Sequence, residues 1–98
     1  MSIKKQFVKT KPVCKVTFVL AGGDAIKASV VGDFNSWNPS AGVLTKLKNG
    51  NFKGVFDLGK DATYEFKYLV DDVYVNEEEA DDYVWNNFAG SENSVLVV

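Results

Sequence analysis

An all-β fold, a sandwich of about seven short antiparallel strands, is what the sequence predicts. Two observations support it: apolar and polar side chains alternate in several short runs, and turn-forming residues separate those runs. No stretch has the apolar period of an amphipathic α-helix. The 98 residues, 46% of them hydrophobic, suffice for one domain with its own core.

The expected strands follow one another along a single domain. Residues 1–12 form a Lys-rich lead-in, which either pairs with a sheet edge or is a mobile tail, and the β-sandwich domain spans residues 13–98. The expected strands are 13–20, 26–31, 43–48, 51–58, 64–70, 73–75 and 94–98. This number of strands in a chain of this length favours the two-sheet, immunoglobulin-like arrangement.

Alternation within the runs also predicts which side chains are buried. The run 26–31 is expected to bury Ile26, Ala28 and Val30. The run 64–70 has the clearest alternation, and it places Lys67 on the solvent face. Cys14 lies in the apolar run 13–20, so it is expected to be a buried small hydrophobe rather than a reactive thiol.

Turn signals connect these strands. Asn49-Gly50 predicts a hairpin with a type I′ turn, because both residues tolerate a positive φ. Asp71-Asp72 predicts a tight turn between 64–70 and 73–75. The region 76–93 is the least regular, and a helical turn is expected within 77–83.

Composition argues against an enzyme and against several partners. The chain has no His, which removes the usual general base and the commonest metal ligand. All eleven basic residues are Lys, so the side chain preferred for nucleic-acid recognition is missing. The acidic run 77–82 lacks the spacing of a calcium loop and is expected to be solvated. We therefore expect no catalytic residues, no cofactor, no metal and no nucleic-acid partner.

No membrane or export signal is evident in the sequence. The lead-in is positively charged, but it lacks the apolar segment of a signal peptide. No apolar run approaches the ~20 residues of a membrane span. A cytoplasmic protein without a membrane partner is the expectation.

The loop after residue 31 contains the most informative side chain. Trp37 stands among Gly, Asp, Asn, Ser and Pro, where it either folds back as a lid on the core or presents its ring at the surface. An exposed indole can stack on the C–H face of a sugar ring, while neighbouring Asn and Ser side chains bond the hydroxyls. From the residues alone both alternatives stay open.

Three separated motifs resemble a known family. Residues 31–37 (VGDFNSW), 66–71 (FKYLVD) and 93–97 (NSVLV) resemble the "early set" domain that precedes the barrel of isoamylases and glycogen-branching enzymes. They are also similar to the glycogen-binding domain of the AMP-activated kinase beta subunit. Residues 11–18 (KPVCKVTF), from the end of the lead-in into the first expected strand, look like the same region of stand-alone bacterial versions. The resemblance covers residues 13–98 and implies non-catalytic binding of α-1,4-glucans such as glycogen, starch and maltooligosaccharides.

The resemblance also implies which residues bind the glucan. Trp37 matches a tryptophan that stacks on glucose, and Lys67 and Asn93 match residues that hydrogen-bond sugar hydroxyls. Tyr74 stands where the kinase domains have a second stacking Trp, and a phenol ring offers less area. Trp85 lies in a nearby loop, where it either faces the sugar or packs against the end of the sandwich.

Two residues depart from the family's pattern near this site. Asp72 replaces a Gly that usually follows the Asp of the turn, so the direction of Tyr74 is in question. Ala89 stands where a Gly is expected. The alternative function is therefore a protein-interaction sandwich that has lost its sugar and docks on, or regulates, an enzyme of glycogen metabolism. A surface of Tyr83, Trp85 and Phe88 favours that alternative.

Overall fold

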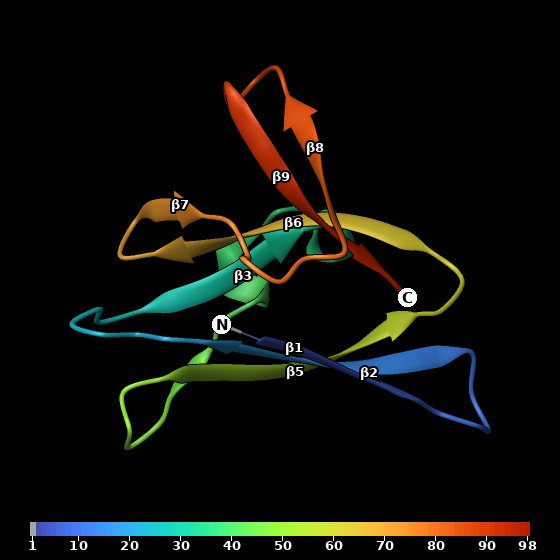
Figure 1. Ribbon diagram of the computed structural model, residues 1–98. Coiled ribbons are helices and arrows are strands. Elements are labelled where there is room, and N and C mark those ends of the chain that lie inside the picture. The colour runs from blue at the N-terminus through green and yellow to red at the C-terminus, as the bar shows by residue number, and fades with distance from the viewer. Residues whose placement is uncertain (1) are drawn as a thin grey trace.

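Two antiparallel sheets face each other in the computed structural model, which describes residues 2–98 (Figure 1). One sheet has the strand order β1-β2-β5-β4 and the other has β3-β6-β9-β8, with β7 also paired to β6. The strands are β1 (Ser2–Phe7), β2 (Val13–Leu20), β3 (Ala28–Gly32), β4 (Thr45–Lys46), β5 (Phe52–Gly59), β6 (Thr63–Val70), β7 (Val73–Val75), β8 (Asp82–Asn86) and β9 (Ser91–Val97). Two short 3₁₀ helices, η1 (Asp33–Asn35) and η2 (Pro39–Ala41), follow β3. The predicted all-β sandwich is confirmed.

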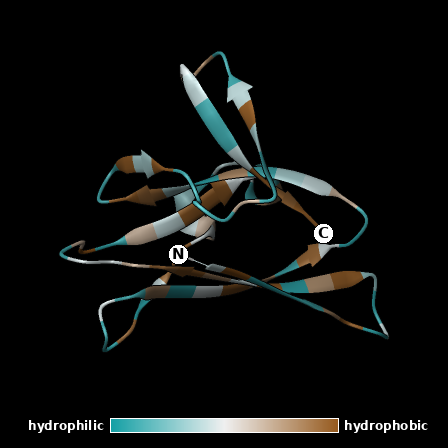
Figure 2. Cartoon of the chain, viewed as in Figure 1, coloured by the Kyte–Doolittle hydropathy of each residue, from teal (hydrophilic) through white to brown (hydrophobic). Residues whose placement is uncertain are grey.

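The core lies between the sheets and is rich in aromatic rings. Phe18 of β2 is at its centre, with ring centroids 5.5 Å from Phe66 and 6.2 Å from Tyr68, both on β6 of the opposite sheet. Cys14 is buried and free, as alternation predicted. Hydrophobic and hydrophilic residues alternate along the strands that enclose this core (Figure 2). Burial of this alternating set drives the two sheets together.

The lead-in is part of the sandwich. β1 pairs with β2 over its whole length, so the lead-in takes the sheet-edge alternative. Lys5 of β1 forms an ion pair with Asp81, which directly precedes β8 of the other sheet. The distance from Lys5 Nζ to Asp81 Oδ2 is 2.6 Å. This exposed ion pair links the first strand to the segment before β8. Within residues 2–98 no helix is long and apolar enough to cross a membrane.

The strand predicted at 26–31 begins later than expected. Ile26 is 83% exposed instead of buried, and β3 starts at Ala28. The reason is Asp71, whose carboxylate accepts hydrogen bonds from the backbone N–H groups of Ile26 and Lys27. These backbone groups are bound to a side chain and cannot join a strand ladder. The strand predicted at 43–48 is likewise reduced, to Thr45–Lys46 and one bridge between Ser29 and Val43.

The type I′ geometry predicted at Asn49-Gly50 is found instead at another turn of the chain. Asn49-Gly50 does close a hairpin, but only Gly50 has a positive φ, of 90°. The bonds from Leu47 N to Asn51 O and from Gly50 N to Leu47 O define a three-residue loop with Gly in the last position. The pair of positive φ angles typical of a type I′ turn occurs at Asp71 and Asp72, with values of 46° and 68°.

The sequence prediction was least accurate in the acidic region, residues 77–83. No helical turn forms within 77–83: residues 77–81 are a loop, and residues 82 and 83 begin β8. Glu77 is not solvated, because its side chain is completely buried. Its Oε1 accepts a bond of 2.8 Å from Tyr68 Oη, and its Oε2 accepts one of 3.0 Å from Glu79 N. The pKa of the Tyr68 hydroxyl is raised far above its usual range. Burial is the larger cause, and the neighbouring Glu77 carboxylate is the second.

Further bonds tie Glu77 to β8 and β9. Its backbone N–H donates to Ser94 Oγ at 2.9 Å, and its carbonyl accepts from Tyr83 Oη at 2.5 Å. Ser94 Oγ in turn donates to Asn76 Oδ1. We call Tyr68, Asn76, Glu77, Tyr83 and Ser94 the Glu77 network. It joins β6, β8 and β9 through a loop that has no regular structure of its own.

Replacing Glu77 with alanine tests this network. Glu77→Ala leaves the Tyr68 hydroxyl and the Glu79 N–H without their acceptors, so it should lower the free energy of unfolding by about 2–4 kcal/mol. Glu78→Ala is the matched control, because Glu78 is exposed, and it should change stability by less than about 0.5 kcal/mol. Urea unfolding followed by circular dichroism measures both. Equal effects of the two substitutions would show that the network is not a structural support.

Candidate functional site

The candidate site lies on the outer face of the second sheet, where the strand that pairs with one edge of β6 changes. We call this place the division of the second sheet. Residues 63–66 of β6 pair with β9, whereas residues 68–70 of the same strand pair with β7. The partner along this edge of β6 therefore changes at Lys67. Beyond that point the β8–β9 hairpin continues away from the sheet, as Figure 1 shows. The change of partner leaves an opening between β7 and the hairpin.

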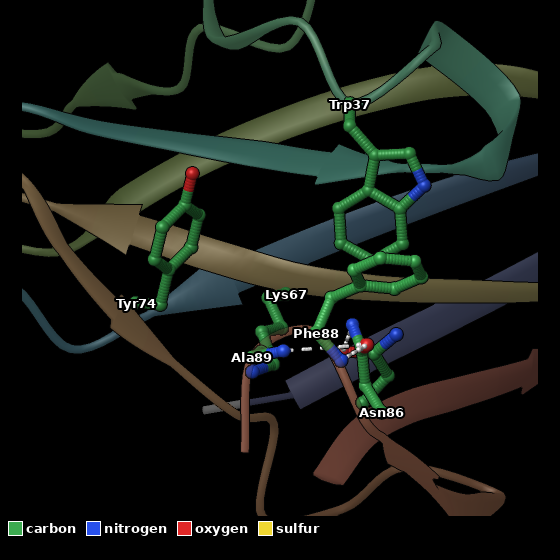
Figure 3. A pocket seen from close by; sticks show the side chains of 7 residues that line it. Trp37, Lys67, Tyr74, Asn86, Phe88 and Ala89 are labelled. Atoms are coloured by element: carbon green, nitrogen blue, oxygen red, sulfur yellow. Dashed lines mark hydrogen bonds between the residues drawn. The ribbon is translucent and has the colours of Figure 1, made fainter. Parts of the chain in front are cut away.

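A pocket of about 260 Å³ occupies this opening. Its walls and floor come from the loop after β3, from β6, from β7 and from the β8–β9 hairpin (Figure 3). The residues that line it are Trp37, Lys67, Tyr74, Asn86, Phe88, Ala89 and Asn93. Four of the five candidate site residues named from the sequence are thus brought together, and Trp85 is left out.

Trp37 lies outside the buried core and presents its ring to the pocket. Its position depends on a compact loop, in which Trp37 N donates to Gly32 O at 2.9 Å. Ser36 and Trp37 both have left-handed backbone, with φ of 56° and 58°. The indole Nε1 donates to Asp33 Oδ1 at 3.1 Å. Trp37 is therefore a surface ring held by its own loop, and it is not a lid on the core.

Lys67 forms part of the floor of the pocket. Alternation placed it on the outer face of β6, which is where it lies, but the expected solvent exposure is wrong: the residue is only 6% exposed. The first residue of β9 contacts it: Lys67 Nζ donates to Ser91 Oγ at 2.6 Å. An ammonium group can donate three hydrogen bonds, so donor capacity remains for a ligand.

Asn93 lies beside Lys67 at the bottom of the pocket and is 3% exposed. Its Nδ2 donates to Glu65 Oε1 at 3.1 Å, which fixes the orientation of the amide. Its Oδ1 accepts only a long bond of 3.5 Å from Asn86 Nδ2. Both amides therefore have hydrogen-bonding capacity that a ligand can use.

Tyr74 forms another wall of the pocket and is 60% exposed. It pairs with Leu69 across the β6–β7 ladder, so its side chain lies on the outer face. Asp72 does not disturb this register, because both residues of the turn adopt left-handed backbone, which Asp tolerates better than most residues. The departure from Gly at position 72 thus leaves Tyr74 facing the site.

Trp85 does not line the pocket, and strand alternation explains why. It pairs with Glu92, whereas Asn86 pairs with Ser91 and Val84 with Asn93. Successive side chains of a strand point to opposite faces, so Trp85 points away from the face that carries Asn86 and Asn93. Its ring is 61% exposed, and its Nε1 donates to Asn87 Oδ1 at 2.9 Å.

The sequence prediction missed Asn86, Phe88 and Ala89, which the hairpin tip brings to the pocket. Phe88 is fully exposed, and the Asn86 side chain holds the tip by accepting bonds from the backbone N–H groups of Phe88 and Ala89. One signal was present: Phe88 is an aromatic residue surrounded by Asn, Ala and Gly in a loop close to Asn93.

The arrangement suits a ring-shaped polar ligand. Aromatic side chains supply apolar faces at the walls, and amides with one ammonium group supply donors and acceptors at the floor. Among residues 2–98 no group of three or more His, Cys, Asp or Glu side chains is placed to hold a metal ion. The pocket is built for stacking and hydrogen bonding.

Comparison with known proteins gives no match by sequence. No protein-family model matches the chain, and a search of curated proteins finds none similar to it. The chemistry of the pocket and the three sequence motifs are therefore the features that indicate a function.

Proposed function

We propose that the protein is a non-catalytic binding module for α-1,4-glucans, a class that includes glycogen, starch and maltooligosaccharides. One observation carries the proposal. Trp37, Lys67, Tyr74 and Asn93 are far apart in the sequence but line one pocket, with the rings at its walls and the polar groups at its floor. The motifs that contain Trp37, Lys67 and Asn93 are those that resemble the glucan-binding family.

Stacking supplies the apolar part of recognition. A pyranose ring has C–H groups on its faces, and an indole or phenol ring packs flat against them. Trp37 offers the larger area, while the exposed rings of Tyr74 and Phe88 extend the apolar surface across the mouth of the pocket. Three rings around one pocket suit a chain of several sugars better than a single sugar.

Hydrogen bonds supply the polar part. Lys67 can donate to a sugar hydroxyl, and the Asn93 amide offers an acceptor oxygen whose internal bond is long. Water competes for these groups, so each bond contributes about 0.5–1.5 kcal/mol, and more where the group is charged. Together with stacking, this predicts a dissociation constant on the order of micromolar to millimolar.

The Trp37→Ala variant tests the stacking contribution. It should weaken binding of maltoheptaose by about tenfold, because removing the ring forfeits its stacking and its buried area. Trp85→Ala is the matched control, since Trp85 points away from the pocket, and it should bind as the wild type does. Isothermal titration calorimetry measures both. Equal binding by wild type and Trp37→Ala would refute the assignment of the ring.

The Lys67→Met variant tests the floor of the pocket. Methionine keeps most of the apolar stem and removes the ammonium donors, so affinity for maltoheptaose should fall about tenfold. Lys15→Met is the control on the outer face of the other sheet, and it should have no effect on affinity. A Lys67→Met protein that is folded and binds normally would remove Lys67 from the site.

A second candidate function is a protein-interaction surface, with sugar binding lost. The full exposure of Phe88 and the largely exposed ring of Trp85, both on the β8–β9 hairpin, favour it, because exposed apolar groups are typical of partner sites. The partner would be an enzyme of glycogen metabolism. A titration in which maltoheptaose fails to bind, together with co-elution of such an enzyme that Phe88→Ala abolishes, would favour this function over the first.

A further inference from the structure

Asp33 connects the Trp37 ring to the sheet that forms the floor of the pocket. Its Oδ1 accepts the indole N–H of Trp37 at 3.1 Å, and its Oδ2 accepts the backbone N–H of Glu65 at 2.8 Å. The two oxygens of one carboxylate therefore join a loop side chain to β6. Each oxygen accepts a hydrogen bond from a different donor, so both bonds exist at the same time.

Glu65 continues this connection to the opposite side of the pocket. Its backbone is bonded to Asp33, and its side-chain Oε1 accepts Asn93 Nδ2 at 3.1 Å. Three hydrogen bonds thus link Trp37, Asp33, Glu65 and Asn93, with the covalent side chain of Glu65 joining the last two bonds, and we call these four residues the Asp33 brace. It joins the stacking ring to one of the polar groups of the floor.

The bonds that hold the loop backbone are separate from the bond that holds the Trp37 ring. Ser36 and Trp37 are non-glycine residues in left-handed backbone, a conformation that costs about 1 kcal/mol or more per residue. Asn35 holds the loop from within, since its Oδ1 accepts Gly32 N and its Nδ2 donates to Val30 O. These bonds fix the backbone but leave the direction of the Trp37 ring undetermined. Of the hydrogen bonds among residues 2–98, the one to Asp33 is what directs the ring.

We propose that Asp33 is a positioning residue, which sets the face of the Trp37 ring relative to Lys67 and Asn93. The identity of the ligand rests on the proposed function. The role of Asp33 in orienting the ring does not.

The brace has a consequence for recognition. The indole N–H is occupied by Asp33, so Trp37 contributes only the face of its ring to a ligand. Polar recognition then falls to Lys67 and Asn93, whose positions relative to the ring are fixed before the ligand arrives. A pre-arranged site loses less conformational entropy on binding than one that must assemble.

A double-mutant cycle separates positioning from a general effect on the fold. Asp33→Ala should weaken binding of maltoheptaose about fivefold in the wild-type background, through loss of ring orientation. In the Trp37→Phe background the ring has no N–H group to hold. There, Asp33→Ala should weaken binding by less than about twofold. Equal weakening in both backgrounds would overturn the proposal, because Asp33 would then act through the backbone of β6 alone.

A readout without sugar tests the same role independently. In a Trp85→Phe background Trp37 is the single tryptophan. Asp33→Ala should shift its indole N–H resonance and speed the exchange of that proton with water, because the acceptor is lost. Asp71→Asn is the matched control. Asp71 also accepts backbone N–H groups through its carboxylate, at Ile26 and Lys27, so its change should lower the melting temperature without altering the indole resonance.

These two measurements distinguish the failure of each proposal. An indole resonance that responds to Asp33→Ala in a protein that binds no maltoheptaose would support the positioning role and refute glucan binding. An indole resonance unaffected by Asp33→Ala would overturn the positioning role, even if maltoheptaose binds to the wild type.

Discussion

The candidate site depends on a single constraint, the shared edge of β6. One edge of this strand pairs with β9 and then, after Lys67, with β7. Because β9 and β7 cannot occupy the same edge, the β8–β9 hairpin diverges from the sheet and opens the pocket. Lys67 lies at the point of divergence, which is why a lysine on the outer face of a strand becomes almost completely covered. The same geometry brings Tyr74 of β7 opposite the hairpin tip with Phe88.

Polar groups hold this division of the sheet from both sides. On the inner side, the Glu77 network joins β6, β8 and β9 around a buried carboxylate that accepts hydrogen bonds from two donors. On the outer side, the Asp33 brace joins the Trp37 loop to β6 and to Asn93. A carboxylate serves in each case because it can accept bonds from two different donors at once. The aromatic core around Phe18 supplies most of the burial, whereas these carboxylates determine where the site residues lie.

Strand periodicity predicted most of the fold and part of the site. The alternation in β2 and β6 is regular because both strands have one face in the core, so the outer position of Lys67 was predictable, although its burial was not. Its environment includes Ser91 at the start of β9, which is distant in sequence. Ile26 and Glu77 were mispredicted for a related reason. Asp71 captures the backbone next to Ile26, and Tyr68 gives Glu77 a buried donor, and neither contact has a local sequence signal. Trp85 lies outside the three motifs, and one residue of register separates it from the face that Asn86 and Asn93 share.

We propose that a glucan binds in the division of the second sheet. Amide and indole chemical shifts measured during a titration with maltoheptaose test it most directly. We expect concentration-dependent shifts for the amides of Lys67, Tyr74 and Asn93 and for the indole of Trp37, while the indole of Trp85 stays unchanged. Shifts confined to the region around Trp85, or no shifts at millimolar sugar, would contradict it.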